Sequence, residues 1–284
     1  MNTQLPGPLV SSAWLAEHLK ASDVKIMDAS WYLPGEKRNP AAEFEKTHIE
    51  GAVFFDIDGV RDPDNPLPHM LPSPKCFAEH MSRLGISNAD VVIAYDSAGI
   101  FSAPRAWWTL RVFGHDRVAI LDGGLPAWRT ANLPTISGPA LPVASTFEAN
   151  FRPELVRDLA QMLSNMETEL EQVVDARGHG RFVGSEPEVR PGLRSGHIPG
   201  SSNLPYTELI DTTNQSLLPA NKIEAALVSR GIDIKQPIVT TCGSGISASL
   251  LALALYICGH NAVAVYDGSW TEWGGRIDTP LESE

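Results

Sequence analysis

The clearest chemical signal in the sequence is a cysteine at the start of a glycine-rich segment. The segment Cys242-Gly243-Ser244-Gly245-Ile246-Ser247 follows an apolar run that predicts a strand at Ile238–Thr241, and a helix is expected at Ala248–Cys258. Successive backbone N–H groups in such a loop form an anion-binding cradle, and a helix N-terminus adds partial positive charge. Both effects favour the thiolate of Cys242 over the thiol, so we predict that it is a nucleophile.

The residues near Cys242 in the sequence help to decide which reaction such a thiolate performs. A cysteine phosphatase holds its phosphate dianion with an arginine six residues after the cysteine, but that position is Ala248 and no residue from 243 to 249 is basic. The other cysteines, Cys76 and Cys258, are distant in sequence, which argues against a redox pair. Acyl transfer would need a general base and an oxyanion site. Attack on a sulfur atom remains, because the same amides could hold a persulfide anion.

The elements that must position this loop occur twice in the chain. The paired segments keep the same order and a nearly constant separation of about half the chain, which indicates two tandem domains. The matches are Asp28-Ala29 with Asp175-Ala176, His48–Ala52 with His197–Ser201, Leu84–Ile86 with Arg230–Ile232, Val92–Asp96 with Ile238–Cys242, Gly114-His115 with Gly259-His260, and Asp122-Gly123 with Asp267-Gly268.

Strand and helix patterns alternate in both halves. Short β-branched runs predict buried strands at Val24–Met27, Val91–Tyr95, Val118–Leu121, Gln172–Val174, Ile238–Thr241 and Ala262–Val265. Helical patterns lie at Trp14–Lys20, Ala103–Val112, Ile223–Ser229 and Ala248–Cys258. This alternation predicts an α/β fold in each half, with a mostly parallel sheet flanked by helices. We expect one domain at residues 1–138, a Pro-rich linker at 139–157 and a second domain at 158–284.

The repeat also separates residues of the fold from residues of the chemistry. His48 and His197 occupy equivalent positions, so we interpret both as structural. By the same reasoning Asp122 and Asp267 form turns and Trp128 and Trp273 belong to the core. Trp107 and Trp108 fall on an apolar helix, so we interpret them as packing residues as well. The position of Cys242 is different, because the first half carries Asp96 there. The first domain therefore lacks the nucleophile.

Over nearly the whole chain, these features resemble the rhodanese-type sulfurtransferase family, with two rhodanese-like domains of which the first lacks the cysteine. The loop is similar to the Cys-Gly-Ser-Gly-Val-Thr loop of members that use 3-mercaptopyruvate, with Ile246 and Ser247 as the departures. Members that use thiosulfate typically carry basic residues directly after the cysteine. The neutral loop therefore implies 3-mercaptopyruvate as the donor, with thiosulfate:cyanide sulfurtransfer as the alternative.

The resemblance also implies roles for individual residues. Arg181 and Arg190 match the family's substrate arginines, and guanidinium groups suit the carboxylate and keto oxygens of mercaptopyruvate. Asp58, His69 and Ser244 match positions proposed to form a Ser-His-Asp proton relay. Arg177 follows the repeated Asp-Ala and is expected to be structural. The rest of the loop, Gly243, Gly245, Ile246 and Ser247, is expected to bind the donor.

The implied reaction has two steps and needs no metal or organic cofactor. The Cys242 thiolate takes sulfur from 3-mercaptopyruvate, pyruvate leaves, and a thiol such as reduced thioredoxin, or cyanide, accepts the sulfur from the persulfide. A non-catalytic sulfur carrier or binding module on the same fold is a further alternative. It would make a persulfide but release no pyruvate catalytically, and it would not need two arginines for an α-keto acid.

Composition restricts the remaining classes. The 284 residues are 43% hydrophobic and 20% charged, as in a globular protein, and the net charge is −12. So acidic a chain is a poor candidate for binding nucleic acid or an anionic membrane. Three cysteines do not make a disulfide framework, and the first ten residues contain no basic residue. We therefore expect a cytoplasmic protein without a targeting segment.

Overall fold

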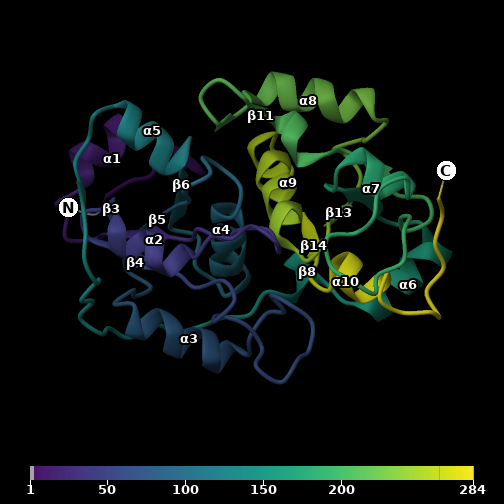
Figure 1. Ribbon diagram of the computed structural model, residues 1–284, viewed down its shortest axis with the longest axis horizontal. Coiled ribbons are helices and arrows are strands. Elements are labelled where there is room, and N and C mark those ends of the chain that lie inside the picture. The colour runs from purple at the N-terminus through teal and green to yellow at the C-terminus, as the bar shows by residue number, and fades with distance from the viewer. Residues whose placement is uncertain (1–2, 262, 284) are drawn as a thin grey trace. The chain divides into compact units, whose positions relative to one another are not determined.

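The computed structural model describes residues 3–261 and 263–283, which form two compact units (Figure 1). Each unit includes a short segment from the other half of the sequence. The first unit consists of Met1–Pro63, Leu71–Arg152 and Asp211–Leu217, and the second of Asp64–Met70, Pro153–Ile210 and Leu218–Glu284. Within the described residues, no helix has the length and apolar composition needed to cross a membrane.

The first unit is built on a five-stranded sheet in the order β1-β6-β5-β2-β4, and every neighbouring pair is parallel. The central strands are entirely or almost entirely buried, as expected for a parallel sheet covered on both faces. The strands are β1 (Leu9–Val10), β2 (Val24–Asp28), β4 (Ala52–Phe54), β5 (Val91–Tyr95) and β6 (Val118–Leu121).

The second unit repeats this sheet. Its order, β10-β9-β13-β14-β8, is the same topology read from the opposite edge, and all four pairings are again parallel. The strands are β8 (Val156–Arg157), β9 (Gln172–Asp175), β10 (Ser202–Asn203), β13 (Ile238–Thr241) and β14 (Ala264–Tyr266). Two two-stranded ladders accompany the sheets. One is the antiparallel pair of β3 (His48–Ile49) with β7 (Thr135–Ile136), and the other pairs β11 (Ile210–Asp211) with β12 (Ser216–Leu217).

Helices flank the sheet of each unit (Figure 1). In the first unit they are α1 (Ser12–His18), α2 (Pro40–Lys46), α3 (Pro74–Arg83), α4 (Ala103–Val112) and α5 (Gly124–Thr130). In the second they are α6 (Leu159–Thr168), α7 (His179–Val183), α8 (Ala220–Ser229), α9 (Ile246–Ile257) and α10 (Ser269–Trp273), with 3₁₀ turns η1 (Pro153–Leu155) and η2 (Tyr206–Leu209).

The predicted α/β alternation is confirmed, with differences at element ends. The strands at 91–95, 118–121 and 238–241 have the predicted bounds, as does the helix at 103–112. The strand predicted at 262–265 is observed at Ala264–Tyr266, while Ala262 lies outside the described residues. Helix α9 begins at Ile246, two residues earlier than predicted, because Gly245 takes a left-handed conformation and directly precedes the first turn.

The residues interpreted as structural are buried in matching environments. His48 and His197 each place a ring Nδ1 against a phenylalanine carbonyl oxygen, at 2.7 and 2.9 Å, and each ring stacks on that same phenylalanine. The indole N–H groups of Trp128 and Trp273 each donate to a proline carbonyl oxygen. These pairs confirm the repeat at the level of single contacts.

The predicted linker at 139–157 is held by contacts along its length. The backbone N–H of Ser145 donates to the Ser82 carbonyl, and that of Asn150 donates to the Phe113 carbonyl. Its last residues, Val156 and Arg157, form β8 at the edge of the second sheet. These contacts fix the course of the segment. The bounds of the domains themselves stay a prediction.

Candidate active site

Cys242 directly follows β13, at the carboxyl end of a central strand of the second sheet. It is a free cysteine and is buried. Gly245 has a φ of 83°, a left-handed conformation that glycine adopts without strain, and it turns the chain into α9. The loop thus leads from Cys242 to the N-terminus of a 12-residue helix, where backbone N–H groups favour an anion.

Helix α10 anchors this loop by donating backbone N–H groups to two carbonyl oxygens of the loop. The N–H of Trp270 donates to the Cys242 carbonyl and that of Thr271 to the Gly243 carbonyl, both at 2.9 Å. The N–H of Cys242 donates to the Ser269 hydroxyl oxygen at 3.4 Å. Carbonyl oxygens repel an anion, so occupying two of them with N–H donors makes the surroundings of the sulfur more favourable for negative charge.

The equivalent loop of the first unit holds a carboxylate in this position. Asp96 follows β5 as Cys242 follows β13, and its side chain is 1% exposed. One carboxylate oxygen accepts the N–H of Ala98 at 2.9 Å. The other accepts three N–H groups, from Phe101 at 2.8 Å and from Ser102 and Ala103 at 2.9 Å. In the first unit, the loop that precedes α4 therefore directs four backbone N–H groups at the carboxylate of its own Asp96.

The other two cysteines differ from Cys242 in setting. Burial raises the pKa of the Cys258 thiol to about 11, and the charge of Glu224 adds to the rise. The thiol is therefore protonated at neutral pH and donates weakly to the Ala220 carbonyl oxygen at 3.7 Å. Cys76 lies near the start of α3. Neither has the strand-loop-helix setting of Cys242.

Arg181 and Arg190 both belong to the second unit. Arg181 lies on α7, its side chain is 20% exposed, and its Nη1 is 3.8 Å from Oε2 of Glu188. Arg190 is half-buried in the irregular segment that follows α7.

A buried chain of charges supports Arg181. Nη1 of Arg177 is 2.6 Å from Glu188, and Nη2 is 2.7 Å from Asp175 at the end of β9. The Arg177 guanidinium also lies over the Trp270 ring at 4.2 Å. Burial raises the pKa of Glu188, while Arg177 and Arg181 oppose that rise. Arg177 is thus structural, as its place beside the repeated Asp-Ala suggested.

Glu188 was missed by sequence reasoning. It lies between Arg177 and Arg181, and its side chain is 3% exposed. A buried carboxylate is retained when charges and hydrogen bonds compensate its desolvation, which the two arginines do here. The available signal was an acidic residue two positions before Arg190, but no spacing rule distinguishes such a residue from a solvated one.

His69 lies in the segment 64–70, which belongs to the second unit. It is buried, and its Nδ1 is 3.1 Å from the main-chain oxygen of Ser244. Because a carbonyl oxygen only accepts, Nδ1 donates in this contact, and in the neutral ring Nε2 then carries the lone pair. The φ of His69 is 63°, in the left-handed region that non-glycine residues rarely adopt. Ser244 is itself buried.

Asp58, the third residue of the predicted relay, belongs to the first unit. It is exposed, and its Oδ2 accepts the indole N–H of Trp31 at 3.1 Å. Its main-chain oxygen accepts a hydrogen bond from Nε of Arg61 at 3.1 Å. The second unit holds the other predicted site residues, which are Cys242, Gly243, Ser244, Gly245, Ile246, Ser247, His69, Arg181 and Arg190.

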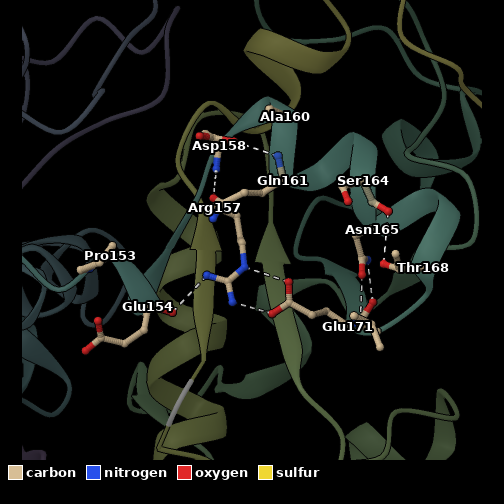
Figure 2. A pocket seen from close by; sticks show the side chains of 11 residues that line it. Pro153, Glu154, Arg157, Asp158, Ala160, Gln161, Ser164, Asn165, Thr168 and Glu171 are labelled. Atoms are coloured by element: carbon tan, nitrogen blue, oxygen red, sulfur yellow. Dashed lines mark hydrogen bonds and ion pairs between the residues drawn. The ribbon is translucent and has the colours of Figure 1, made fainter.

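A separate pocket of about 660 Å³ lies beside α6 (Figure 2). Arg157 and Glu171 face each other in it and form two hydrogen bonds of 2.8 and 2.7 Å. This bidentate pair neutralises the guanidinium that an anionic ligand would need. Among the described residues that line the pocket, none is a predicted site residue. The described residues also include no cluster of three or more His, Cys, Asp or Glu side chains suited to a metal ion.

Comparison with known proteins relates these features to a family. The model of the rhodanese-like domain matches residues 11–131 and 158–276. The chain is 45% identical to thiosulfate/3-mercaptopyruvate sulfurtransferase 1, mitochondrial, of Arabidopsis thaliana, over 97% of the chain and 78% of the relative. It is 44% identical to human (Homo sapiens) 3-mercaptopyruvate sulfurtransferase, over 95% of the chain and 93% of the relative.

A solved structure gives the same result. The crystal structure of SseA from Escherichia coli, described as a 3-mercaptopyruvate sulfotransferase, superposes with a TM-score of 0.85 at 41% identity. The match covers 93% of this chain and 98% of that one. The predicted fold is therefore confirmed, with a parallel-sheet α/β core in each of two rhodanese-like domains. The chain belongs to the rhodanese-like sulfurtransferase family.

Proposed function

We propose that this chain is an enzyme that transfers sulfur from 3-mercaptopyruvate to an acceptor through a persulfide on Cys242 and releases pyruvate. The observation that carries the proposal is the pair of equivalent loops. One presents a cysteine at a strand end, and the other binds the Asp96 carboxylate through four backbone N–H groups. Relatives named for this activity are 44% and 45% identical over nearly the whole chain.

The donor is recognised at its two ends. Arg181 and Arg190 bind the carboxylate and keto oxygens, for which planar guanidinium groups are suited. Glu188 and Arg177 keep Arg181 in place through the buried ion pairs. The loop residues Gly243, Gly245, Ile246 and Ser247 contact the sulfur end. Because none of them is basic, the loop suits a thiol donor better than the thiosulfate dianion.

The first step breaks the bond between carbon and sulfur in the donor. The Cys242 thiolate attacks the donor sulfur, a new S–S bond forms, and the electron pair of the C–S bond remains on carbon as the enolate of pyruvate. The enolate takes up a proton, and the sulfur stays on Cys242 as a persulfide. The carbon gains the electrons that the sulfur loses, so the step needs no external oxidant or reductant.

The proton is handled by the relay of Ser244, His69 and Asp58. With Nδ1 donating to the Ser244 carbonyl, the neutral His69 ring has Nε2 free of a proton and able to accept one. His69 then passes the proton of the donor thiol toward the enolate carbon, and Asp58 favours the charged imidazolium. Backbone N–H groups stabilise negative sulfur throughout, a contribution of about 3 kcal/mol for each well-placed donor.

The second step regenerates the thiolate. The thiolate of an acceptor such as reduced thioredoxin, or cyanide, attacks the outer sulfur of the persulfide, and the Cys242 thiolate leaves. The order of events is ping-pong, because pyruvate departs before the acceptor reacts. A thiol acceptor requires a reducing compartment, and we propose the cytoplasm, which cell fractionation would test.

Pyruvate release tests the proposed function. The purified chain with 3-mercaptopyruvate and a dithiol acceptor is expected to release pyruvate catalytically, and Cys242→Ser is expected to abolish release. Cys258→Ser is the matched control and should leave the rate unchanged. No turnover by the wild type would refute the enzyme and leave the sulfur carrier.

Thiosulfate:cyanide sulfurtransfer is the second candidate function, because the name of the Arabidopsis relative includes both donors. The two donors are compared at equal concentration with cyanide as the acceptor. A higher kcat/KM for 3-mercaptopyruvate is expected from the neutral loop. A higher value for thiosulfate would overturn the donor assignment while leaving Cys242 as the nucleophile.

A further inference from the structure

We propose that Trp31 is a positioning residue for the reaction, because its indole orients the Asp58 carboxylate. Trp31 is in turn anchored by the loop around Asp96, which carries no nucleophile. The inference rests on the proposed function, because Asp58 matters only if the relay operates. Under this inference the first unit contributes to the reaction, although the loop of that unit carries no cysteine.

The contact to Asp58 is made by the indole N–H. Nε1 of Trp31 donates to Oδ2 of Asp58 at 3.1 Å. Trp31 is buried, whereas Asp58 is exposed, so the indole is the better-fixed partner. The indole N–H carries no charge and therefore fixes one carboxylate oxygen without neutralising it, which a lysine or arginine would do.

The backbone of Trp31 is held by Ser102. The N–H of Trp31 donates to the Ser102 hydroxyl oxygen at 3.0 Å, and the same hydroxyl donates to the Ala29 carbonyl at 2.7 Å. Ser102 is fully buried and directly precedes α4. Its hydroxyl therefore ties the segment after β2 to the loop after β5 through one donated and one accepted hydrogen bond.

Asp96 in turn holds Ser102. Oδ2 of Asp96 accepts the N–H of Ser102 at 2.9 Å, together with the N–H groups of Phe101 and Ala103. The chain of contacts runs from Asp96 through Ser102 and Trp31 to Asp58, and all four residues belong to the first unit. Three of the four are buried, so the series is rigid up to its last member. Asp96, which occupies in the first unit the position equivalent to Cys242, therefore anchors this series of contacts.

The first test is a double-mutant cycle of Trp31→Phe and Asp58→Asn. Trp31→Phe keeps an aromatic ring and removes the indole N–H. We expect it to lower kcat with 3-mercaptopyruvate about tenfold, the loss typical of a hydrogen bond to a charged group. KM should stay unchanged, and the pH profile of kcat should shift as it does in Asp58→Asn. The double variant should be no slower than the slower single variant.

Trp14→Phe is the matched control, because Trp14 lies on α1 and stacks on His18. It should leave kcat and the pH profile unchanged. Multiplicative losses in the double variant, or a wild-type pH profile in Trp31→Phe, would overturn the inference. If Trp31→Phe does not fold, Trp31→His, which keeps a ring N–H, replaces it and should retain more of the rate than Trp31→Leu; equal rates would count against the role.

A second readout does not depend on turnover. The indole ¹⁵N–H resonance of Trp31 is assigned by its absence in Trp31→Phe, and it should move when Asp58 is titrated in the wild type. In Asp58→Asn this titration should be lost. A resonance that does not respond to Asp58 would overturn the inference even in an active enzyme. Absence of pyruvate release with an intact titration would instead count against the proposed function.

Discussion

Arg181 is the residue whose proposed role is easiest to separate from folding, because its side chain is partly exposed and its contact with Glu188 is long. Arg181→Lys keeps the charge and loses the planar fork that binds a carboxylate through two hydrogen bonds. We expect KM for 3-mercaptopyruvate to rise about tenfold or more, with a smaller change in kcat. Arg276→Lys is the control, since Arg276 pairs with Asp278 on the surface. An unchanged KM in Arg181→Lys would remove it from the donor site.

Asp28 and its counterpart Asp175 differ in a way that predicts a dependence on pH. Arg177 pairs with Asp175, but Ser30 stands at the equivalent position beside Asp28. Burial raises the pKa of Asp28 to about 6, although hydrogen bonds from Ser30 and Tyr95 oppose the rise. The folded state therefore binds this proton more tightly than the unfolded state, whose pKa is near 4. The stability from this group is present below about pH 4 and is lost as the pH rises through about 6.

Asp28→Asn removes this titration. The variant should gain stability over the wild type at pH 7, on the order of 2 kcal/mol, and the gain should shrink toward pH 4. Urea denaturation of both proteins across this range measures the difference directly. A difference that grows on acidification, or that does not change with pH, would contradict the assignment.

At the residue scale, the sequence was most informative where the two halves differ. The change from Asp96 to Cys242 identified the candidate nucleophile, and the pairing of His48 with His197 removed two histidines from the candidates. Glu188 escaped this comparison because its importance comes from Arg177 and Arg181 on either side of it, and those contacts arise only in the folded chain.

At the scale of elements, the long buried strands and helices were predictable because apolar runs report burial. The edge strands β1, β4, β8 and β10 were missed, since each has only two or three residues and shows no periodicity. They pair at the edges because the neighbouring strands leave N–H and C=O groups to be satisfied. The places of Asp58 and His69 in the fold likewise could not be predicted from local sequence patterns.

The Asp96 carboxylate in the loop after β5 is expected to stabilise the first unit. Asp96→Ala would leave four backbone N–H groups without their acceptor, two of them buried and two partly buried, and we expect the free energy of unfolding to fall by about 3 kcal/mol or more. Asp96→Asn keeps one acceptor oxygen and should lose less. Chemical denaturation of the two variants measures the order. Equal stability of Asp96→Ala and the wild type would show that the loop does not depend on its carboxylate.

At the scale of the whole molecule, the repeat predicted two domains, and the structure adds an exchange of segments between the halves. Residues 64–70 belong to the second unit and residues 211–217 to the first. His69 and Gln215 lie in these two segments, and each has a φ of 63°. The separation between His69 and Gln215 is close to that of the other paired segments, which indicates that the exchanged segments are themselves part of the repeat. Sequence similarity alone did not reveal them, because the segments share no side-chain pattern.

This exchange predicts that the second half of the chain is insufficient by itself. A fragment of residues 153–284 keeps Cys242, Arg181 and Arg190 but lacks residues 64–70 and the contact of His69 with Ser244. We expect it to melt at a lower temperature than the full chain and to release no pyruvate from 3-mercaptopyruvate. Full activity in the fragment would show that neither the exchanged segment nor the first unit is needed.

The most direct test of the account is a single-turnover reaction analysed by mass spectrometry. The purified chain is mixed with 3-mercaptopyruvate without an acceptor, pyruvate is quantified, and the protein is digested to locate added mass. We predict one pyruvate per chain and one added sulfur atom on the peptide that contains Cys242, with neither in Cys242→Ser. Pyruvate without added sulfur, or sulfur on Cys76 or Cys258 instead, would contradict the claim that the loop around Cys242 holds the transferred sulfur.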